Sequence, residues 1–225
     1  MTGRPTVVNS EGMTGLKQKV RWVAERSPIA VFAGLGALVL GLGLAPQAHA
    51  GVASTTHFVE PGYAALGLEP EVTLTDGAGM GLNARFTYGM NDLSNLTLIG
   101  GSGGGPRRFR LGANASFDFF PDMEGQPGVG IAAQTLYLRT PEGGRLDAQA
   151  MPYIHKSFST PGGEVEPFLT VPFGLSFLTN TYRPVTSLVI GSLFKRGESI
   201  RYVTEVGINI NNSNTYVSGG IVYYP

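Results

Sequence analysis

The sequence predicts an all-β protein, a transmembrane antiparallel up-and-down β-barrel of about ten strands, with 8–12 strands possible. Three observations predict it. Segments of about 9–14 residues alternate apolar and polar side chains, as tilted membrane strands do. Short turn-rich links separate these segments, and charged residues make up only 14% of the chain, against roughly 25% in soluble domains. After residue 50 no apolar run is long enough for a spanning helix.

Residues 1–50 are expected to be a secretory signal and not part of the fold. A basic stretch comes first, an apolar run covers residues 28–45, and Ala48-His49-Ala50 has the small-x-small pattern of a cleavage site. We expect export through the Sec pathway and cleavage after Ala50, with a start at Met13 or a retained membrane anchor as alternatives. The predicted domains are a signal at 1–50, a periplasmic tail at 51–61 and a barrel at 62–225.

Charge and cysteine content exclude several functional classes for the mature chain, residues 51–225. It keeps 11 basic and 14 acidic residues, so its net charge is near −3, and nucleic acid is not an expected partner. The chain has no cysteine, so neither a disulfide nor a thiolate metal site is available. We predict no cofactor and no bound metal.

Ten strands are predicted in order along the chain, separated by links rich in Gly, Pro, Asn and Asp, which allow the backbone to reverse. Several prolines fall inside the segments, and each removes a hydrogen-bond donor from the ladder. Pro172, in mid-strand, has no explanation at this stage. The predicted strands are residues 63–74, 79–89, 93–100, 107–119, 128–139, 146–158, 164–177, 182–194, 200–210 and 215–224.

The second, fourth and ninth segments alternate most clearly. In residues 107–119 the apolar side chains from Phe109 to Phe119 alternate with a second face that runs from Arg108 to Asp118 and is mostly polar. A period of two predicts that the apolar face contacts lipid and the polar face lines the lumen. The fifth, eighth and tenth segments are small or apolar on both faces, so the pattern leaves their orientation open.

Residues 214–224 are expected to close the barrel, because they alternate, carry aromatic residues near both ends and bring the chain to Tyr224. A membrane barrel has to pair its last strand with its first to leave no open edge. Aromatic residues near strand ends predict two interfacial girdles. One girdle would hold Phe109, Tyr137, Phe177, Tyr182 and Tyr216, and the other Tyr63, Tyr88, Phe119, Phe158 and Tyr224.

Charged residues on the polar faces predict a network of ion pairs in the lumen. A first turn centred on Gly77 would place Glu69 opposite Arg85, with Glu71 one step along. Such a pair would either satisfy buried charges structurally or act as a gate for a small pore. The predicted lumenal charge network consists of Glu69, Glu71, Arg85, Arg108, Arg110, Asp118, Arg201 and Glu205.

His155 and Ser157 are the candidates for catalysis. A turn at 159–163 would place His155 opposite Glu166 and Ser157 opposite Glu164, which would supply a base, a hydroxyl and orienting carboxylates. The His155-Lys156-Ser157 triplet resembles the His-x-Ser pattern of outer-membrane lipid A deacylases, and the resemblance implies a lipid-modifying activity. A lumenal hydrogen-bond network is the favoured alternative, because His155 is expected on the periplasmic side, whereas lipid A lies in the outer leaflet.

Residues 84–92 and 93–98 (ARFTYGMND, LSNLTL) resemble a hairpin of small outer-membrane β-barrel proteins, in which a strand ends at Gly, an Asn/Asp turn follows and alternating leucines begin the next strand. With the signal and the last strand, the resemblance spans about residues 62–224. It implies a bacterial outer-membrane location, insertion by the barrel-assembly machinery through the last strand, and lipid and lipopolysaccharide as neighbours. It implies no activity.

The expected function is a structural or narrow-pore role, the passage of small solutes through a lumen closed by paired charges, and no enzymatic activity. The links between segments are short, which disfavours adhesion and receptor roles because these usually reside on long loops. Two alternatives remain, a deacylase-like enzyme that uses His155 and Ser157, and a soluble secreted β-barrel domain.

Overall fold

The computed structural model of this chain describes residues 58–75, 78–104, 108–140 and 143–225. The expected signal peptide, its cleavage site and residues 51–57 of the expected tail lie outside the described residues. Within the described part of the chain, no helix has the length and apolar character needed to cross a membrane.

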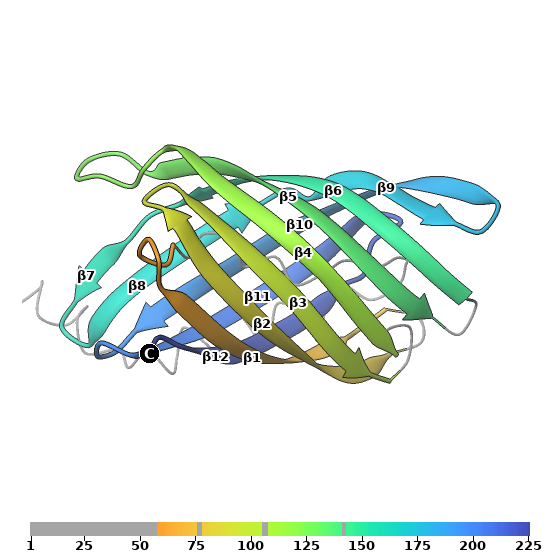
Figure 1. The fold of residues 1–225 in the computed structure, drawn as a ribbon, viewed down its shortest axis with the longest axis horizontal. Helices are drawn as coiled ribbons and strands as arrows, with labels where there is room; N and C mark the ends of the chain where they lie inside the picture. Colours follow the sequence, from red (N-terminus) through yellow and green to blue (C-terminus); the bar gives the residue numbers. More distant parts are fainter. Residues whose placement is uncertain (1–57, 76–77, 105–107, 141–142) are drawn as a thin grey trace, which may run out of the picture. The chain divides into compact units, whose positions relative to one another are not determined.

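The described residues form strands connected by links that range from two residues (92–93) to seven (121–127). Figure 1 shows these strands inclined to a common axis. They are β1 (Ala64–Thr73), β2 (Gly79–Asn91), β3 (Ser94–Gly103), β4 (Phe109–Phe120), β5 (Gly128–Thr140), β6 (Gly143–His155), β7 (Phe158–Thr160), β8 (Gly163–Thr170), β9 (Phe173–Leu178), β10 (Thr181–Lys195), β11 (Ile200–Asn211) and β12 (Tyr216–Tyr223).

The sheet closes on itself as an antiparallel barrel. Consecutive strands pair along the chain, except β6 with β7 and β8 with β9, and β12 pairs with β1. The short β7 continues β6, and β8 and β9 together form one strand between β6 and β10, so the segments make ten strands, as predicted. Residue 58 and the C-terminus lie at the same end, which we call the terminal end; the C-terminal ends of β1, β3, β5, β9 and β11 lie at the opposite end.

The strand between β6 and β10 is interrupted at Pro172, which divides it into β8 and β9. The register does not change across the break, since Thr170 lies opposite Val189 of β10 and Phe173 lies opposite Thr186. The carbonyl of Pro172 still accepts a hydrogen bond of 2.9 Å from β10. Because proline removes only a donor, Pro172 takes one hydrogen bond from the ladder and leaves the barrel closed.

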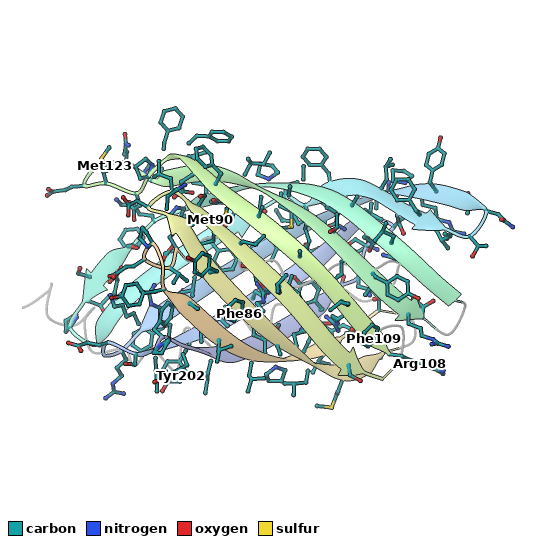
Figure 2. The ribbon with its side chains drawn as sticks, in the orientation of Figure 1. Phe86, Met90, Arg108, Phe109, Met123 and Tyr202 are labelled. Carbon is teal, nitrogen blue, oxygen red and sulfur yellow. The ribbon has the colours of Figure 1, made fainter. Side chains whose placement is uncertain are left out.

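The two faces of the barrel wall differ in polarity. Leu68 on the outer face is 56% exposed, whereas the next residue, Glu69, faces the lumen and is 0% exposed. The same alternation holds along β4, where Phe109 and Phe117 are exposed and Arg110 is buried. Figure 2 shows aromatic and aliphatic side chains on the outside of the wall. Apolar residues outside and charges inside are the arrangement of a membrane-spanning barrel and the inverse of a soluble one.

Two aromatic residues assigned to the girdles face the lumen instead. Tyr216 is 0% exposed and Tyr224 is half-buried, while Tyr223 is on the outer face. Their orientation follows from pairing: Tyr223 lies opposite Leu66 of β1 and Ile200 of β11, which both face outward. Residues 216–223 are small or apolar on both faces, so their own pattern could not set this phase.

The lumen contains apolar as well as polar residues. A buried apolar cluster lies on the wall formed by β5, β6, β8, β10 and β11, whereas the wall formed by β1 to β4 carries mainly polar groups. The apolar lumen cluster consists of Ala132, Met151, Tyr153, Phe168, Val189, Leu193 and Val203. The apolar lumen cluster thus shares its wall with buried polar groups such as His155 and Glu205, whereas the wall from β1 to β4 is mainly polar.

Candidate functional site

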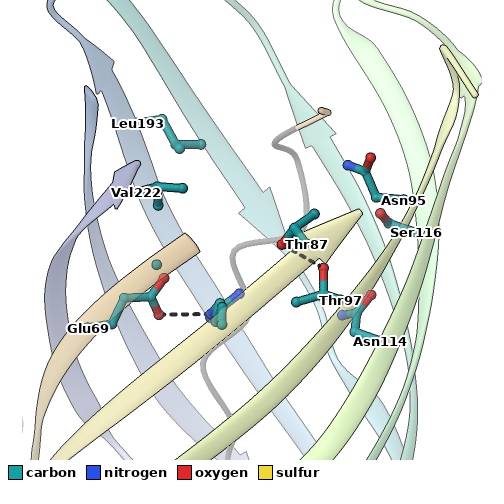
Figure 3. A pocket seen from close by; sticks show the side chains of 10 residues that line it. Glu69, Thr87, Asn95, Thr97, Asn114, Ser116, Leu193 and Val222 are labelled. Atoms are coloured by element: carbon teal, nitrogen blue, oxygen red, sulfur yellow. Dashed lines mark hydrogen bonds and ion pairs between the residues drawn. The ribbon is translucent and has the colours of Figure 1, made fainter. Parts of the chain in front are cut away.

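The centre of the lumen holds two ion pairs. Arg85 Nε lies 2.9 Å from Glu69 Oε2, and Arg110 Nη1 lies 2.9 Å from Glu71 Oε2. All four side chains are buried, and a dashed line from Glu69 in Figure 3 marks its ion pair with Arg85. The predicted register was wrong by two residues, since Glu69 lies opposite Asn83. The ion pair forms diagonally, because long side chains reach the neighbouring cross-strand position.

Glu71 links three strands of the polar wall. Besides its ion pair with Arg110 of β4, it accepts hydrogen bonds from Asn83 Nδ2 of β2 (3.3 Å) and from Thr73 Oγ1 (3.4 Å). Gly101 of β3 makes room for this arrangement, since a Cβ there would lie 2.8 Å from Arg110 Cγ. Because Gly101 has no side chain, the long side chain of Arg110 can pass over β3 and reach Glu71 on β1.

His155 lies toward the terminal end between two carboxylates. Its Nε2 is 3.2 Å from Asp118 Oδ2, and its Nδ1 is 2.8 Å from Glu166 Oε1. Phe168, not Glu166, is directly opposite His155 in the ladder, so the predicted register was again wrong by two residues. Within the described residues, no three His, Asp or Glu side chains are grouped so that they could hold a metal ion.

Ser157 does not join His155 in a catalytic pair. Both imidazole nitrogens face carboxylates, and β6 ends at His155, so the alternation that would have aligned the two side chains stops there. The backbone N–H of Ser157 instead donates a 2.6 Å hydrogen bond to Asp122 in the β4–β5 link. The geometry therefore lacks the nucleophile–base contact that acyl transfer requires.

Lys156 and Asp122 form a clasp at the terminal end. Lys156 Nζ donates to Asp122 Oδ1 (2.6 Å) and to the carbonyls of Met123 (2.6 Å) and Gln126 (3.0 Å). Burial alone would raise the pKa of the Asp122 carboxyl. The hydrogen bonds from Lys156 and Ser157 and the positive charge of Lys156 together outweigh burial, so the pKa lies below its usual range. The clasp orders the longest link between strands.

Among the lumenal polar contacts that sequence reasoning missed, two involve Arg145 and Tyr216. On β6, Arg145 pairs with Asp147, with Nε 2.9 Å from Oδ1 and a second contact from Nη2 to Oδ2. Tyr216 donates a 2.7 Å hydrogen bond to Glu205 on the neighbouring strand. Arg145 was missed because the sixth strand was predicted to begin at residue 146, whereas β6 begins at Gly143. Tyr216 was missed because its strand showed no polar face.

Two predicted members of the charge network occupy the ends of the barrel. Arg108 is exposed and precedes β4, so it lies at the rim, where no lumen wall surrounds it; its assignment to the lumen was wrong. Arg201 is half-buried, and its guanidinium carbon lies 4.5 Å from the ring centroid of Tyr224.

A small cavity remains beside the Glu69–Arg85 pair. The space open to the centre of a water molecule amounts to about 20 Å³, room for roughly one or two waters. Its polar lining comes from β1 to β4, and Leu193 and Val222 close its other side (Figure 3). Thr87 and Thr97 share a 3.0 Å hydrogen bond on its wall.

Closed strand pairing, a lipid-compatible exterior and buried lumenal charges together define a transmembrane antiparallel β-barrel. No family model matches the sequence, and no curated protein matches it. Among solved structures, the chain is similar to an outer-membrane channel from Pseudomonas putida F1, with 9% identity, 78% of this chain and 100% of that chain covered, and a TM-score of 0.46.

Two further solved structures are similar. One is a de novo designed transmembrane β-barrel, with 13% identity, 75% of this chain and 100% of that chain covered, and a TM-score of 0.39. The other is Ail, the attachment invasion locus protein of Yersinia pestis, with 11% identity, 72% and 96% coverage, and a TM-score of 0.29. Identities and scores this low define neither a family nor an activity for this chain.

Proposed function

We propose that this chain is an integral barrel of the bacterial outer membrane that gives small solutes a narrow path, closed at rest by paired charges in the lumen. The terminal end would then be periplasmic. The short links at the opposite end support this role, because they offer no extended surface for adhesion. We also expect β12 to be the strand that the barrel-assembly machinery recognises, and lipopolysaccharide to be a lipid neighbour.

One observation carries the narrow-path proposal. The wall from β1 to β4 is polar, and its water-sized cavity lies directly beside the Glu69–Arg85 pair. A purely structural barrel could be filled with apolar side chains at lower desolvation cost, because buried ion pairs are often no more stable than apolar replacements. Charged side chains that can rearrange are a common way to build a gate.

Single-channel conductance of refolded residues 51–225 in planar bilayers tests the proposal. We expect rare, discrete openings in the parent protein and more frequent ones in the Glu69→Ala/Arg85→Ala double variant, which removes both charges and leaves none uncompensated. Arg139→Ala is the control, since it removes an exposed arginine from the outer face of β5. A folded, heat-modifiable barrel that stays silent in both the parent and the double variant would contradict the pore.

No specific contact favours the alternative of a lipid A-modifying enzyme, because His155 and Ser157 do not meet. The decisive comparison is His155→Ala, which should leave lipid A acylation unchanged. The exposed apolar exterior disfavours a soluble secreted domain, because such a surface would aggregate in buffer without detergent.

A further inference from the structure

The chain turns back on itself just before β1. Tyr63 N–H donates to the Glu60 carbonyl (3.0 Å) across Pro61 and Gly62, and Gly62 has φ +82°. Proline followed by a glycine with positive φ is the signature of a type II turn. The turn is anchored to β2, because Gly62 N–H donates to the Gly89 carbonyl (3.0 Å), and the chain before the turn lies against Asn95 of β3.

Residues 58 and 59 fill the lumen at the terminal end. Val59 is 2% exposed, and its N–H donates to Asn95 Oδ1 (3.2 Å), an inward side chain of β3. Phe58 packs against the apolar lumen cluster and lies 6.5 Å from the His155 ring, measured between centroids. A segment expected to be a periplasmic tail is therefore partly packed inside the barrel.

Gly89 forms the seat for this segment. A Cβ at Gly89 would lie 2.3 Å from both the Val59 and the Glu60 carbonyl oxygens. Gly67, which also faces the lumen, would accept a Cβ with ordinary contacts, the nearest at 3.5 Å to Arg85 Cβ. Only the first of these two glycines is required by the close approach of residues 59 and 60.

We propose that residues 58–62 are a plug that seals the terminal mouth of the barrel, with Asn95 and Gly89 as its seat. The plug and the central charge pairs then close the lumen at two successive levels. The seal stands independently of any conduction, whereas its role as a gate rests on the proposed pore function.

Cysteine labelling tests the seal directly, since the chain contains no cysteine. In refolded residues 51–225, Val59→Cys should react with a membrane-impermeant maleimide about tenfold or more slowly than Glu60→Cys, because a buried thiol reacts only when its segment opens. Glu60 is the neighbouring exposed position. Equal labelling rates at the two positions in the parent barrel would overturn the plug.

Displacement of the plug gives the second test. Gly89→Ala should raise the labelling rate of Val59→Cys to that of Glu60→Cys, whereas Gly67→Ala should leave it protected. If both alanine variants raise the labelling rate of Val59→Cys equally, Gly89 is not the specific contact that holds the plug. If Gly89→Ala fails to fold, Asn95→Ala, which removes the Val59 hydrogen bond, takes its place.

Conductance separates the plug from the pore. Gly89→Ala should open more often than the parent and than Gly67→Ala in planar bilayers. Labelling as expected in barrels that never conduct would overturn the gating role and the pore while leaving the seal in place. Conduction by a Gly89→Ala barrel whose Val59→Cys thiol remains protected would overturn the plug as the gate.

Discussion

At the scale of the residue, the lumen is a set of charges that depend on their partners. Arg110 is 1% exposed and contacts Glu71 through two nitrogens, at 2.9 and 3.5 Å. Removing one partner leaves the other charge buried and uncompensated, which costs far more than the pair contributes. The stability of the barrel therefore depends on whether each buried charge keeps its partner, more than on any one charged residue.

Arg110→Met is expected to destabilise the barrel by about 3–5 kcal/mol, because Glu71 would remain buried without its cation. Arg110→Met/Glu71→Met should recover most of this loss. Urea unfolding of residues 51–225 in detergent measures this loss. Circular dichroism follows the unfolding, because the only tryptophan, Trp22, precedes residue 51. A double variant as unstable as the single one would contradict this account.

The Asp122 clasp predicts a pH dependence of stability. Its folded pKa is depressed, so the clasp contributes fully above the unfolded value of about 3.9 and loses its contribution as pH falls through the folded pKa. Asp122→Asn should lower stability by about 1 kcal/mol at pH 7, since Lys156 is partly exposed. Urea midpoints at pH 7 and pH 3 check this: the difference between parent and variant should shrink at pH 3, and a difference that persists there would contradict the clasp.

At the scale of the element, pairing with neighbours decides what a strand's own pattern leaves open. In β4 the alternation of aromatic and charged residues sets both faces, and the prediction was confirmed there. In β12 the residues are small or apolar on both faces, so the inward position of Tyr216 follows only from its pairing with Gly207 of β11. The Tyr216 ring lies where a Gly207 side chain would be, with a ring carbon 2.0 Å from an added Cβ.

Gly207→Ala is therefore expected to weaken the β11–β12 pair by about 1–3 kcal/mol, because the ring of Tyr216 would have to shift. Gly219→Ala, in the adjoining strand, is the matched control, since its Cβ would meet nothing closer than 3.6 Å. Urea midpoints of the two variants should differ by this amount. Equal midpoints for the two variants would contradict the prediction, because the Tyr216 ring would then move aside at little cost.

The strands and most inward charges could be predicted from the sequence, with Arg108, Arg145 and Asp147 as exceptions, whereas the register could not. Alternation shows which side chains of a strand face inward. It does not show which residues of two neighbouring strands lie opposite each other, because a shift of two residues keeps every side chain on the same face. This is why Glu69 and Arg85 were predicted directly opposite each other and are found diagonal, and why Ser157 was assigned to the face of His155 beyond the end of β6. The plug was missed because Phe58 and Val59 precede the first alternating segment.

At the scale of the whole molecule, the barrel presents apolar residues outward and encloses charges. Leu98, halfway along β3, is 52% exposed, and Met80, the second residue of β2, is 73% exposed. If lipid surrounds the wall, a charge at the first position lies in hydrocarbon and a charge at the second lies near the interface.

Leu98→Arg is expected to cost about 2–4 kcal/mol in lipid vesicles, and Met80→Arg about 0–1 kcal/mol. Urea unfolding in vesicles of matched thickness measures both variants. A soluble barrel would tolerate the two substitutions equally, so equal costs would contradict a membrane-spanning wall.

The most direct test of the whole account is the single-channel conductance of a variant that removes both closures, Gly89→Ala combined with Glu69→Ala/Arg85→Ala. If the plug and the charge pair close the lumen independently, open probability should rise by about the product of the two separate increases, since independent barriers have additive free energies. A combined variant that is folded and heat-modifiable yet conducts no more than the parent would contradict a pore closed at two levels.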